Sequence, residues 1–275
     1  MGKIVKLKNP EAAAAIFAGW QETMIYSCLQ GVMGEIYADE EEHPASAMAV
    51  LADFCFFAGK PIPELAAYIS EIYRRDFLIM VPGDDAWAVL IERIYGERAK
   101  KVTRYAIKKE EHIWDIDKLR KAVDGLPEGY TLQMIDEKMY HQCWEAEWSR
   151  DLVAQFENYA AYRQWGLGAV ILQGQEIVAG ASSYTSYIGG IEIEIDTRED
   201  YRRRGLAYVC GAKLILECLS RGWYPSWDAQ NLWSVALAEK LGYHFDHTYS
   251  AYEIHCVHME QGKGQGEGND KGTVL

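Results

Sequence analysis

The stretch REDYRRRGLAYVCGAKLILECLSRG, residues 198–222, decides how the second half of this 275-residue chain folds. It places three arginines directly before a glycine: Arg202, Arg203, Arg204 and Gly205. Apolar residues then recur at the spacing of one helix face: Ala207, Cys210, Leu214, Cys218 and Leu219. Gly222 is a typical helix end. The stretch therefore predicts an amphipathic helix over residues 205–219 with positive charge concentrated at its N-terminal end.

The start of this helix is suited to an anion. The first-turn N–H groups of a helix have no internal partner, and the aligned peptide dipoles add partial positive charge there. Gly205 lets a ligand approach the backbone without meeting a Cβ atom, and guanidinium groups suit phosphate. The local chemistry therefore indicates a phosphate group, and a diphosphate would span several donors. The alternative is a solvated surface on which the arginines pair with nearby acids.

The residues around this helix alternate in polarity or have helical spacing. Residues 191–195 read Ile-Glu-Ile-Glu-Ile, which predicts a strand with Glu192 and Glu194 on one face and isoleucines on the other. Residues 168–196 as a whole predict three strands. Upstream we expect a strand at 130–135 and helices at 136–148 and 151–165. Downstream we expect a strand at 224–227, a helix at 232–241 and a strand at 248–254.

The first half has a similar order of predicted elements. An apolar strand over 47–57 is followed by helix, strand, helix and strand, and residues 108–127 interrupt the apolar pattern like a linker. We expect an N-terminal α/β domain over 1–125, a second domain over 126–258 and a flexible tail over 259–275. WAVLIERIYG (87–96) aligns with WSVALAEKLG (233–242). A duplicated unit explains this match, although any helix before a turn gives a similar one.

Composition excludes several classes of protein. The chain carries a formal net charge of −13, which argues against a nucleic acid or an anionic membrane as partner. No window of about 18 apolar residues predicts a membrane span. The six cysteines form no CxxC pair and the seven histidines no HExxH motif, so we expect no metal and a cytoplasmic protein with reduced thiols. The sequence leaves open whether the protein forms a homodimer.

The second half resembles the GNAT superfamily of acyl-CoA-dependent N-acetyltransferases. The family signature (Gln/Arg)-x-x-Gly-x-(Gly/Ala) is matched by Arg202, Gly205 and Ala207. A downstream family pattern is matched by Asn231, Ser234 and Leu241-Gly242-Tyr243. The resemblance covers about residues 130–254. The whole chain also looks like a GNAT branch with an extra N-terminal domain, which includes a zwittermicin A resistance enzyme.

The resemblance implies a fold, a co-substrate and a reaction. It implies an α/β (α+β) fold with a mixed, mostly antiparallel sheet flanked by helices, and a first half that is a degenerate GNAT-like copy. It implies acetyl transfer from acetyl-CoA, without a metal, to the primary amine of a small molecule. The coenzyme would contact two groups of residues: strand residues Ile195, Asp196 and Thr197, and loop and helix residues Arg202, Arg203, Arg204, Gly205, Leu206, Ala207, Tyr208, Asn231 and Ser234.

Among the enzymes of this family, the catalytic residues vary more than the residues of the coenzyme-binding loop. GNAT enzymes often use a carboxylate of the fourth strand as general base, so the resemblance makes Glu192 and Glu194 candidates. Many of these enzymes protonate the thiolate with a tyrosine where this chain has Ala238. Four groups remain as alternative proton donors to the thiolate: Tyr243, Tyr208, Ser234 and water. Ala238 also keeps open a non-catalytic acyl-CoA-binding sensor or interaction module.

The acceptor is expected to be cationic in solution. The net charge of −13 and the acidic strand face favour such a molecule. Aromatic residues at 144–148, with Tyr159, Tyr162 and Trp165, lie where the family's early helices form the acceptor wall. The alternative is that these aromatic side chains pack helices onto the sheet.

Overall fold

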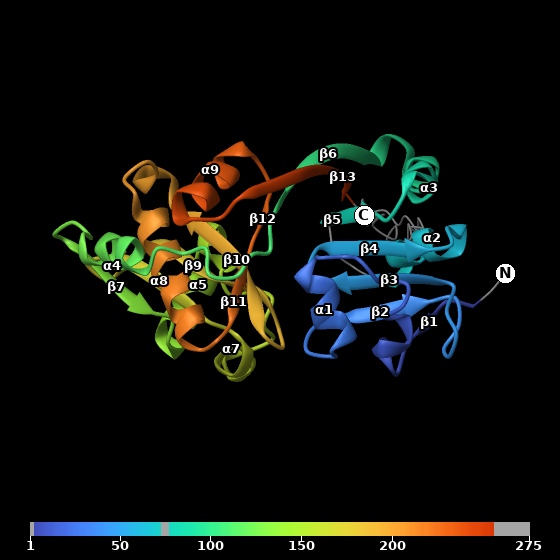
Figure 1. Cartoon of the computed structure of the whole chain (residues 1–275), viewed down its shortest axis with the longest axis horizontal. Coiled ribbons are helices and arrows are strands. Elements are labelled where there is room, and N and C mark those ends of the chain that lie inside the picture. The colour runs from blue at the N-terminus through green and yellow to red at the C-terminus, as the bar shows by residue number, and fades with distance from the viewer. Residues whose placement is uncertain (1–2, 73–76, 256–275) are drawn as a thin grey trace, which may run out of the picture.

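The computed structural model describes residues 3–72 and 77–255, arranged as two halves side by side (Figure 1). Each half contains one sheet with helices packed against it. The tail predicted over 259–275 lies outside the described residues, as does Cys256. Within the described ranges, no helix combines the length and apolar character needed to span a bilayer. The other five cysteines are buried.

The first half is built on an eight-stranded sheet in the order β1-β2-β3-β4-β5-β13-β6-β12. Its strands are β1 (Val5–Lys6), β2 (Glu35–Ala38), β3 (Ser46–Leu51), β4 (Phe54–Gly59), β5 (Phe77–Pro82), β6 (Ala99–Ile107), β12 (Asp228–Ala229) and β13 (Phe245–His255). Its helices are α1 (Thr23–Leu29), α2 (Pro63–Ile72) and α3 (Asp85–Tyr95). The single strand predicted over 47–57 is wrong. It is a hairpin of β3 and β4, with Ala52 in the left-handed region at φ 55°.

Strand β13 comes from the end of the second half but lies inside the first sheet. It pairs antiparallel with β5 on one side and with β6 on the other, so that Tyr252 opposes both Met80 and Lys101. Figure 1 shows β6 and β13 running together from one half to the other. The domain boundary at residue 125 stays a prediction, and this exchange means that a cut there would remove a central strand from the first sheet.

The second half is built on a five-stranded sheet in the order β11-β10-β9-β8-β7. Its strands are β7 (Tyr130–Met134), β8 (Gly168–Gln173), β9 (Glu176–Tyr187), β10 (Gly190–Thr197) and β11 (Tyr224–Ser226). Its helices are α4 (Ile116–Asp124), α5 (Glu137–Glu145), α6 (Glu147–Arg150), α7 (Tyr159–Trp165), α8 (Leu206–Ser220) and α9 (Leu232–Leu241). Neighbouring strands are antiparallel except β10 and β11. The predicted mixed, mostly antiparallel sheet with flanking helices is confirmed.

Two local predictions in this half are wrong. The helix predicted over 151–165 begins only at Tyr159, because Asn158 accepts a hydrogen bond from the N–H of Ala161 and so caps α7 at its start. The predicted linker contains a helix, α4, whose Leu119 is buried in the same core as α8. The interrupted apolar pattern there reflects a helix with one narrow apolar face.

The two halves share a strand order that a duplication explains. In each, a strand leads through a helix to a parallel neighbour and then to a second helix: β4-α2-β5-α3 and β10-α8-β11-α9. The tryptophans aligned from the sequence are not equivalent, however. Trp87 is fully buried, whereas Trp233 is 87% exposed. Duplication therefore stays a prediction, supported by the strand order and not by the tryptophan match.

The alternation of side chains along β10 determines which of them face the core and which face the site. Ile191 and Ile193 are buried in the core that α8 completes with Cys210 and Leu214. The acids of the strand therefore point to the opposite face, as predicted. That face is covered at Glu192, where α1 of the first half packs against it, whereas Glu194 is half-buried and lines a cavity.

Candidate active site

A gap opens between β10 and β11. The two strands pair only from Gly190 opposite Tyr224 to Glu192 opposite Ser226, and β10 then continues to Thr197 with no strand on that side among the described residues. A cavity of about 1040 Å³ follows this part of β10. The backbone of residues 193–197 therefore offers N–H and C=O groups to an extended ligand.

The N-terminal end of α8 lies at one end of this cavity. Gly205 precedes the helix at φ 81°, in the left-handed region, and nothing lies within 4 Å of where its Cβ atom would be. The N–H groups of Leu206, Ala207 and Tyr208 have no hydrogen-bond acceptor in the described part of the protein. Ala207 lines the cavity. This helix start therefore has the unpaired donors that a diphosphate requires.

The three arginines before this helix divide into two groups. Arg202 and Arg203 line the cavity, and Arg202 Nε donates to the Thr197 carbonyl at 3.2 Å. Arg203 adopts φ 62°, which is strained for a residue with a side chain. Arg204 points elsewhere: its guanidinium donates to the Asp200 carbonyl at 2.8 Å and covers the Tyr201 ring. Arg204 therefore points away from the cavity, although the group it donates to is a backbone carbonyl and not one of the nearby acids.

Of the remaining residues predicted to bind the coenzyme, some line the cavity and others do not. Asn231 and Ser234 line the cavity, and Asn231 Oδ1 accepts the Ser234 N–H at 3.0 Å, which caps α9. Ser234 Oγ accepts the Trp227 indole N–H at 3.0 Å, so its own hydroxyl proton can point to a ligand. Leu206 is buried, and the ring of Tyr208 carries Lys240 Nζ 4.3 Å above its centre. Neither Leu206 nor Tyr208 lines either of the two described cavities.

Glu192 lies at the point where β10 and β11 separate. Its side chain is only 5% exposed. The Thr23 hydroxyl of α1 donates to Oε2, while Oε1 has no hydrogen-bond partner among the described residues. A buried carboxylate oxygen without a partner is costly, so it indicates a ligand or a proton at this position.

Glu194 lies two residues further along the same face. Burial raises its pKa to about 8, and the nearby acids Asp151 and Asp196 act in the same direction. Glu194 therefore carries a proton through most of the neutral range. Two carboxyl groups of one strand thus stand in different surroundings, which is a common arrangement where one group donates a proton and another accepts one.

A buried ion pair within the first sheet lines the larger cavity together with Glu192. Arg104 of β6 donates to Asp228 Oδ1 through Nη2 at 2.5 Å and Nε at 2.8 Å, and Tyr249 of β13 donates to Oδ2 at 2.8 Å. The nearby Asp228 raises the pKa of Arg104 above its ordinary value, against the effect of burial. Arg104 and Asp228 are 124 residues apart, so no local sequence pattern signals their pairing. This network fixes the cavity wall where the halves meet.

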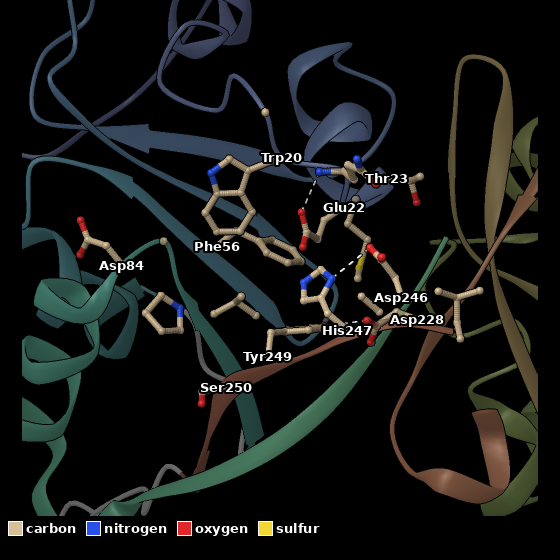
Figure 2. Close-up of a pocket in the computed structure, with 18 of the residues that line it drawn as sticks. Trp20, Glu22, Thr23, Phe56, Asp84, Asp228, Asp246, His247, Tyr249 and Ser250 are labelled. Carbon is tan, nitrogen blue, oxygen red and sulfur yellow. Dashed lines mark hydrogen bonds and ion pairs between the residues drawn. The ribbon is translucent and has the colours of Figure 1, made fainter. Parts of the chain in front are cut away.

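A second cavity of about 630 Å³ also has Glu192 in its wall. Figure 2 shows other residues that line it. The two cavities share Met24, Glu192 and Asp228. Most of the second cavity's wall belongs to the first half, including Trp20, Glu22 and Phe56. Glu192 is therefore within reach of a molecule in either cavity.

Several predicted residues are not brought to the site. Tyr243 is 1% exposed, lines neither described cavity and donates its hydroxyl to the Pro225 carbonyl at 2.6 Å. Burial raises its pKa well above the ordinary value, so it is poorly placed to act as an acid. Tyr159, Tyr162 and Trp165 pack in a separate core and not in an acceptor wall. Tertiary packing, which the sequence pattern does not report, decides both outcomes.

These groups fit a nucleotide thioester such as acetyl-CoA. The free N–H groups of the first turn and the two cavity arginines suit a diphosphate. The unpaired edge of β10 suits an extended arm that carries amide groups. Glu192 stands at the far end, where the two cavities meet. The arrangement can hold an activated acyl group beside a carboxylate.

Comparison with known proteins gives concordant results. The GNAT acetyltransferase family model matches residues 14–252. An uncharacterized N-acetyltransferase of Bacillus subtilis strain 168, YdfB, is 28% identical over 261 residues, covering 84% of this chain and 89% of that protein. The crystal structure of a GCN5-related N-acetyltransferase-like protein from Streptococcus suis 89/1591 is 47% identical with a TM-score of 0.84, covering 90% of this chain and 98% of that one.

A more distant similarity concerns the fold alone. A GCN5-related N-acetyltransferase from Sphaerobacter thermophilus is 15% identical with a TM-score of 0.53, covering 91% of this chain and 95% of that one. The family match also extends well beyond the residues that carry the sequence motifs, because it begins at residue 14 in the first half. This chain therefore belongs to the GNAT acetyltransferase family and is an N-acetyltransferase.

Proposed function

We propose that this enzyme transfers the acetyl group of acetyl-CoA to the primary amine of a small molecule by direct attack on the thioester. One observation carries the proposal. The larger cavity runs from Arg202, Arg203 and Ala207 to Glu192, where the second cavity begins. Two substrates could thus meet at one carboxylate. Acetyl-CoA is the co-substrate of the family, and bound here it supplies an activated acyl carbon.

The larger cavity provides the coenzyme site in this proposal. Arg202, Arg203 and the first-turn N–H groups of α8 hold the diphosphate. The backbone of residues 194–197 pairs with the pantetheine arm, and Asn231 and Ser234 line the opposite wall. These contacts direct the thioester toward Glu192 and hold it in place, which lowers the entropic part of the barrier.

The two strand carboxyl groups take opposite roles in proton transfer. The Glu192 carboxylate accepts the proton that the amine loses as its nitrogen bonds to the acetyl carbon. The carbon–sulfur bond breaks, and the protonated Glu194 donates its proton to the departing sulfur. A carboxyl with a pKa of about 8 is well matched to a thiol, whose pKa is about 8.5. Glu194 thereby fills the role of the tyrosine that Ala238 replaces.

The pH dependence of turnover tests the role of Glu194. Because Glu194 must be protonated to donate, kcat should decline as pH rises through about 8, the pKa that burial and the neighbouring acids give it. Glu194→Gln should lower kcat by about 10-fold or more and remove this declining limb. The measurement is a kcat–pH profile from about pH 6 to 10, with Glu97→Gln on the exposed surface as control. A variant that keeps the declining limb would contradict the assignment.

The exposed indole of Trp233 indicates where the nucleotide end of the coenzyme lies. Trp233 is 87% exposed and lines the larger cavity with Arg203 and Asn231. With the diphosphate at α8 and the arm running inward, the adenine must lie outward, where the indole can stack on it. Trp233→Ala should raise the Kd for acetyl-CoA about 5- to 20-fold, the loss of one stacking contact.

A truncated substrate isolates this contact. S-acetylpantetheine lacks the adenosine diphosphate moiety, so Trp233→Ala should change its KM by less than a factor of two. Leu232→Ala is the matched control, because Leu232 is 66% exposed beside Trp233 but lines neither described cavity. Equal losses with both thioesters would show that Trp233 acts on the structure of α9 and not on adenine.

Thiol release from acetyl-CoA in the presence of an amine library tests the function as a whole. Acetylation of at least one small amine, with a saturable rate, is the expected result. The other candidate is a sensor that binds the coenzyme without turnover, which Ala238 favours. Binding of acetyl-CoA with no turnover of any amine would support that alternative. The cytoplasmic location stays a prediction from the sequence.

A further inference from the structure

We propose that the acceptor amine carries a second positive charge, separated by a flexible aliphatic chain from the nitrogen that is acetylated. The acceptor site is the cavity of about 630 Å³ between the two halves. This inference rests on the proposed function, because it names the substrate class of the same site. A linear diamine or polyamine fits the site better than a monoamine or an amino acid.

Glu192 marks the inner end of the acceptor site. It is only 5% exposed, and it lines the cavity with Oε1 unpartnered among the described residues. An ammonium group placed here would give that oxygen the donor it lacks. The amine to be acetylated would then lie beside the end of the coenzyme cavity.

The remaining charges of this cavity favour a cation over its whole length. Six acids line it, and four of them have no cationic side chain within ion-pair distance in the described ranges: Glu22, Asp84, Asp85 and Glu192. The acids outnumber the cations that line it, which are Lys101, Lys109 and His247, and of these only His247 pairs with one of the acids in the described part of the chain. Lys109 Nζ donates to the Trp227 carbonyl at 3.0 Å, Lys101 lies over the Tyr252 ring, and His247 pairs with Asp246. A substrate carboxylate would therefore meet mostly repulsion.

Glu22 is the carboxylate best placed to bind the second charge. It is part-buried just before α1, and its Oε2 accepts a hydrogen bond from the Gln21 N–H at 3.0 Å. Burial raises its pKa, and the charge of nearby Asp228 adds to this, while Lys109 acts in the opposite direction. A bound ammonium group would compensate the cost of holding this carboxylate charged.

Aromatic side chains line the space between the charged positions. Figure 2 shows Asp84 on one side of Trp20 and Phe56, with Glu22 and Asp228 on the other side. Trp20 and Phe56 contact each other edge to face, with ring centres 6.1 Å apart. Aromatic faces pack well against methylene groups and attract cations. Trp20 and Phe56 thus offer an apolar surface near Glu22 on which the methylene chain of the substrate can pack.

A comparison of matched amines tests this inference. Initial rates with acetyl-CoA are measured for butylamine, 1,4-diaminobutane and a linear triamine, with an aminosugar polycation and an α-amino acid as further probes. We expect kcat/KM for the diamine to exceed that for butylamine by at least about 10-fold, the effect of one further charge contact. The preference should shrink as salt rises from about 20 to 500 mM, because salt screens the attraction.

Two variants locate the second charge. Glu22→Gln should reduce the ratio of diamine to monoamine kcat/KM to below about one third of its wild-type value. Glu97→Gln, the same chemical change on the exposed surface outside both cavities, should keep the ratio unchanged. Unfolding temperatures of both variants serve to show that the fold is kept.

The outcomes separate this inference from the proposed function. Equal use of butylamine and the diamine would overturn the inference but leave an N-acetyltransferase of small amines. A preference for the rigid aminosugar over every linear amine would overturn the linear substrate class. A preference for the α-amino acid would overturn the second positive charge. Binding of acetyl-CoA without turnover of any amine would overturn both proposals.

Discussion

Ala207→Glu is expected to raise the Kd for acetyl-CoA by at least about 100-fold, which corresponds to about 2.7 kcal/mol. Ala207 lies in the first turn of α8 and lines the larger cavity beside Arg203. A carboxylate there would occupy the N–H groups that a diphosphate needs and would repel its charge. Fold stability should stay the same or rise, because an acid at a helix start is favourable by about 0.3–1 kcal/mol.

Isothermal titration calorimetry and a thermal melt together check this result. Ala207→Ser is the matched control, because serine keeps the small volume and adds no charge, and its Kd should stay within about 3-fold of wild type. Loss of binding with an unchanged or higher Tm would mark a lost ligand site in a folded protein. Wild-type affinity in Ala207→Glu would place the diphosphate elsewhere and remove the basis of the coenzyme site.

Glu192→Gln is expected to lower kcat by about 100- to 10,000-fold, the usual contribution of a positioned general base. Glutamine keeps the shape of the side chain and can still accept the hydrogen bond from Thr23, so the junction with α1 is preserved. Affinity for acetyl-CoA should change little, because the diphosphate contacts lie at the other end of the cavity. Steady-state rates and a separate binding titration measure the two effects.

An aromatic amine provides the control for this base. Once it has bonded to the acetyl carbon, its nitrogen is far more acidic than that of an alkylamine and can release its proton to water, so Glu192→Gln should slow its acetylation much less. Equal losses for both acceptors would indicate that Glu192 positions the substrates and does not accept a proton. Retention of more than a tenth of kcat with the alkylamine would contradict the assignment altogether.

The geometry of the proposed coenzyme end of the site could be predicted because its signals are local in sequence. The arginines, Gly205 and the apolar stripe lie within one short segment, and a glycine directly before an amphipathic run marks the start of a helix. The alternation around Glu192 and Glu194 likewise fixes a strand face without any knowledge of the partner. Ala207, Asn231 and Ser234 line the cavity for the same reason, since their spacing sets their place in the first turns of two helices.

The acceptor side could not be predicted because it is assembled from distant segments. Thr23 contacts Glu192 across 169 positions, and Arg104 contacts Asp228 across 124. Tyr243 has a motif position that suggested a role, yet the rings of Trp114 and Trp227 enclose it at 5.5 Å between ring centres. Such contacts depend on which strands and helices pack together in the folded chain, and no periodicity within one segment reports that.

The central place of β13 in the first sheet bears on how this protein forms during synthesis. Residues 245–255 leave the ribosome well after β5 and β6, yet both of these strands need them as neighbours. The early part of the nascent chain must therefore wait with two strand edges exposed while the later part emerges. We expect a chaperone that shields such edges to raise the yield of native enzyme more than one that acts after release.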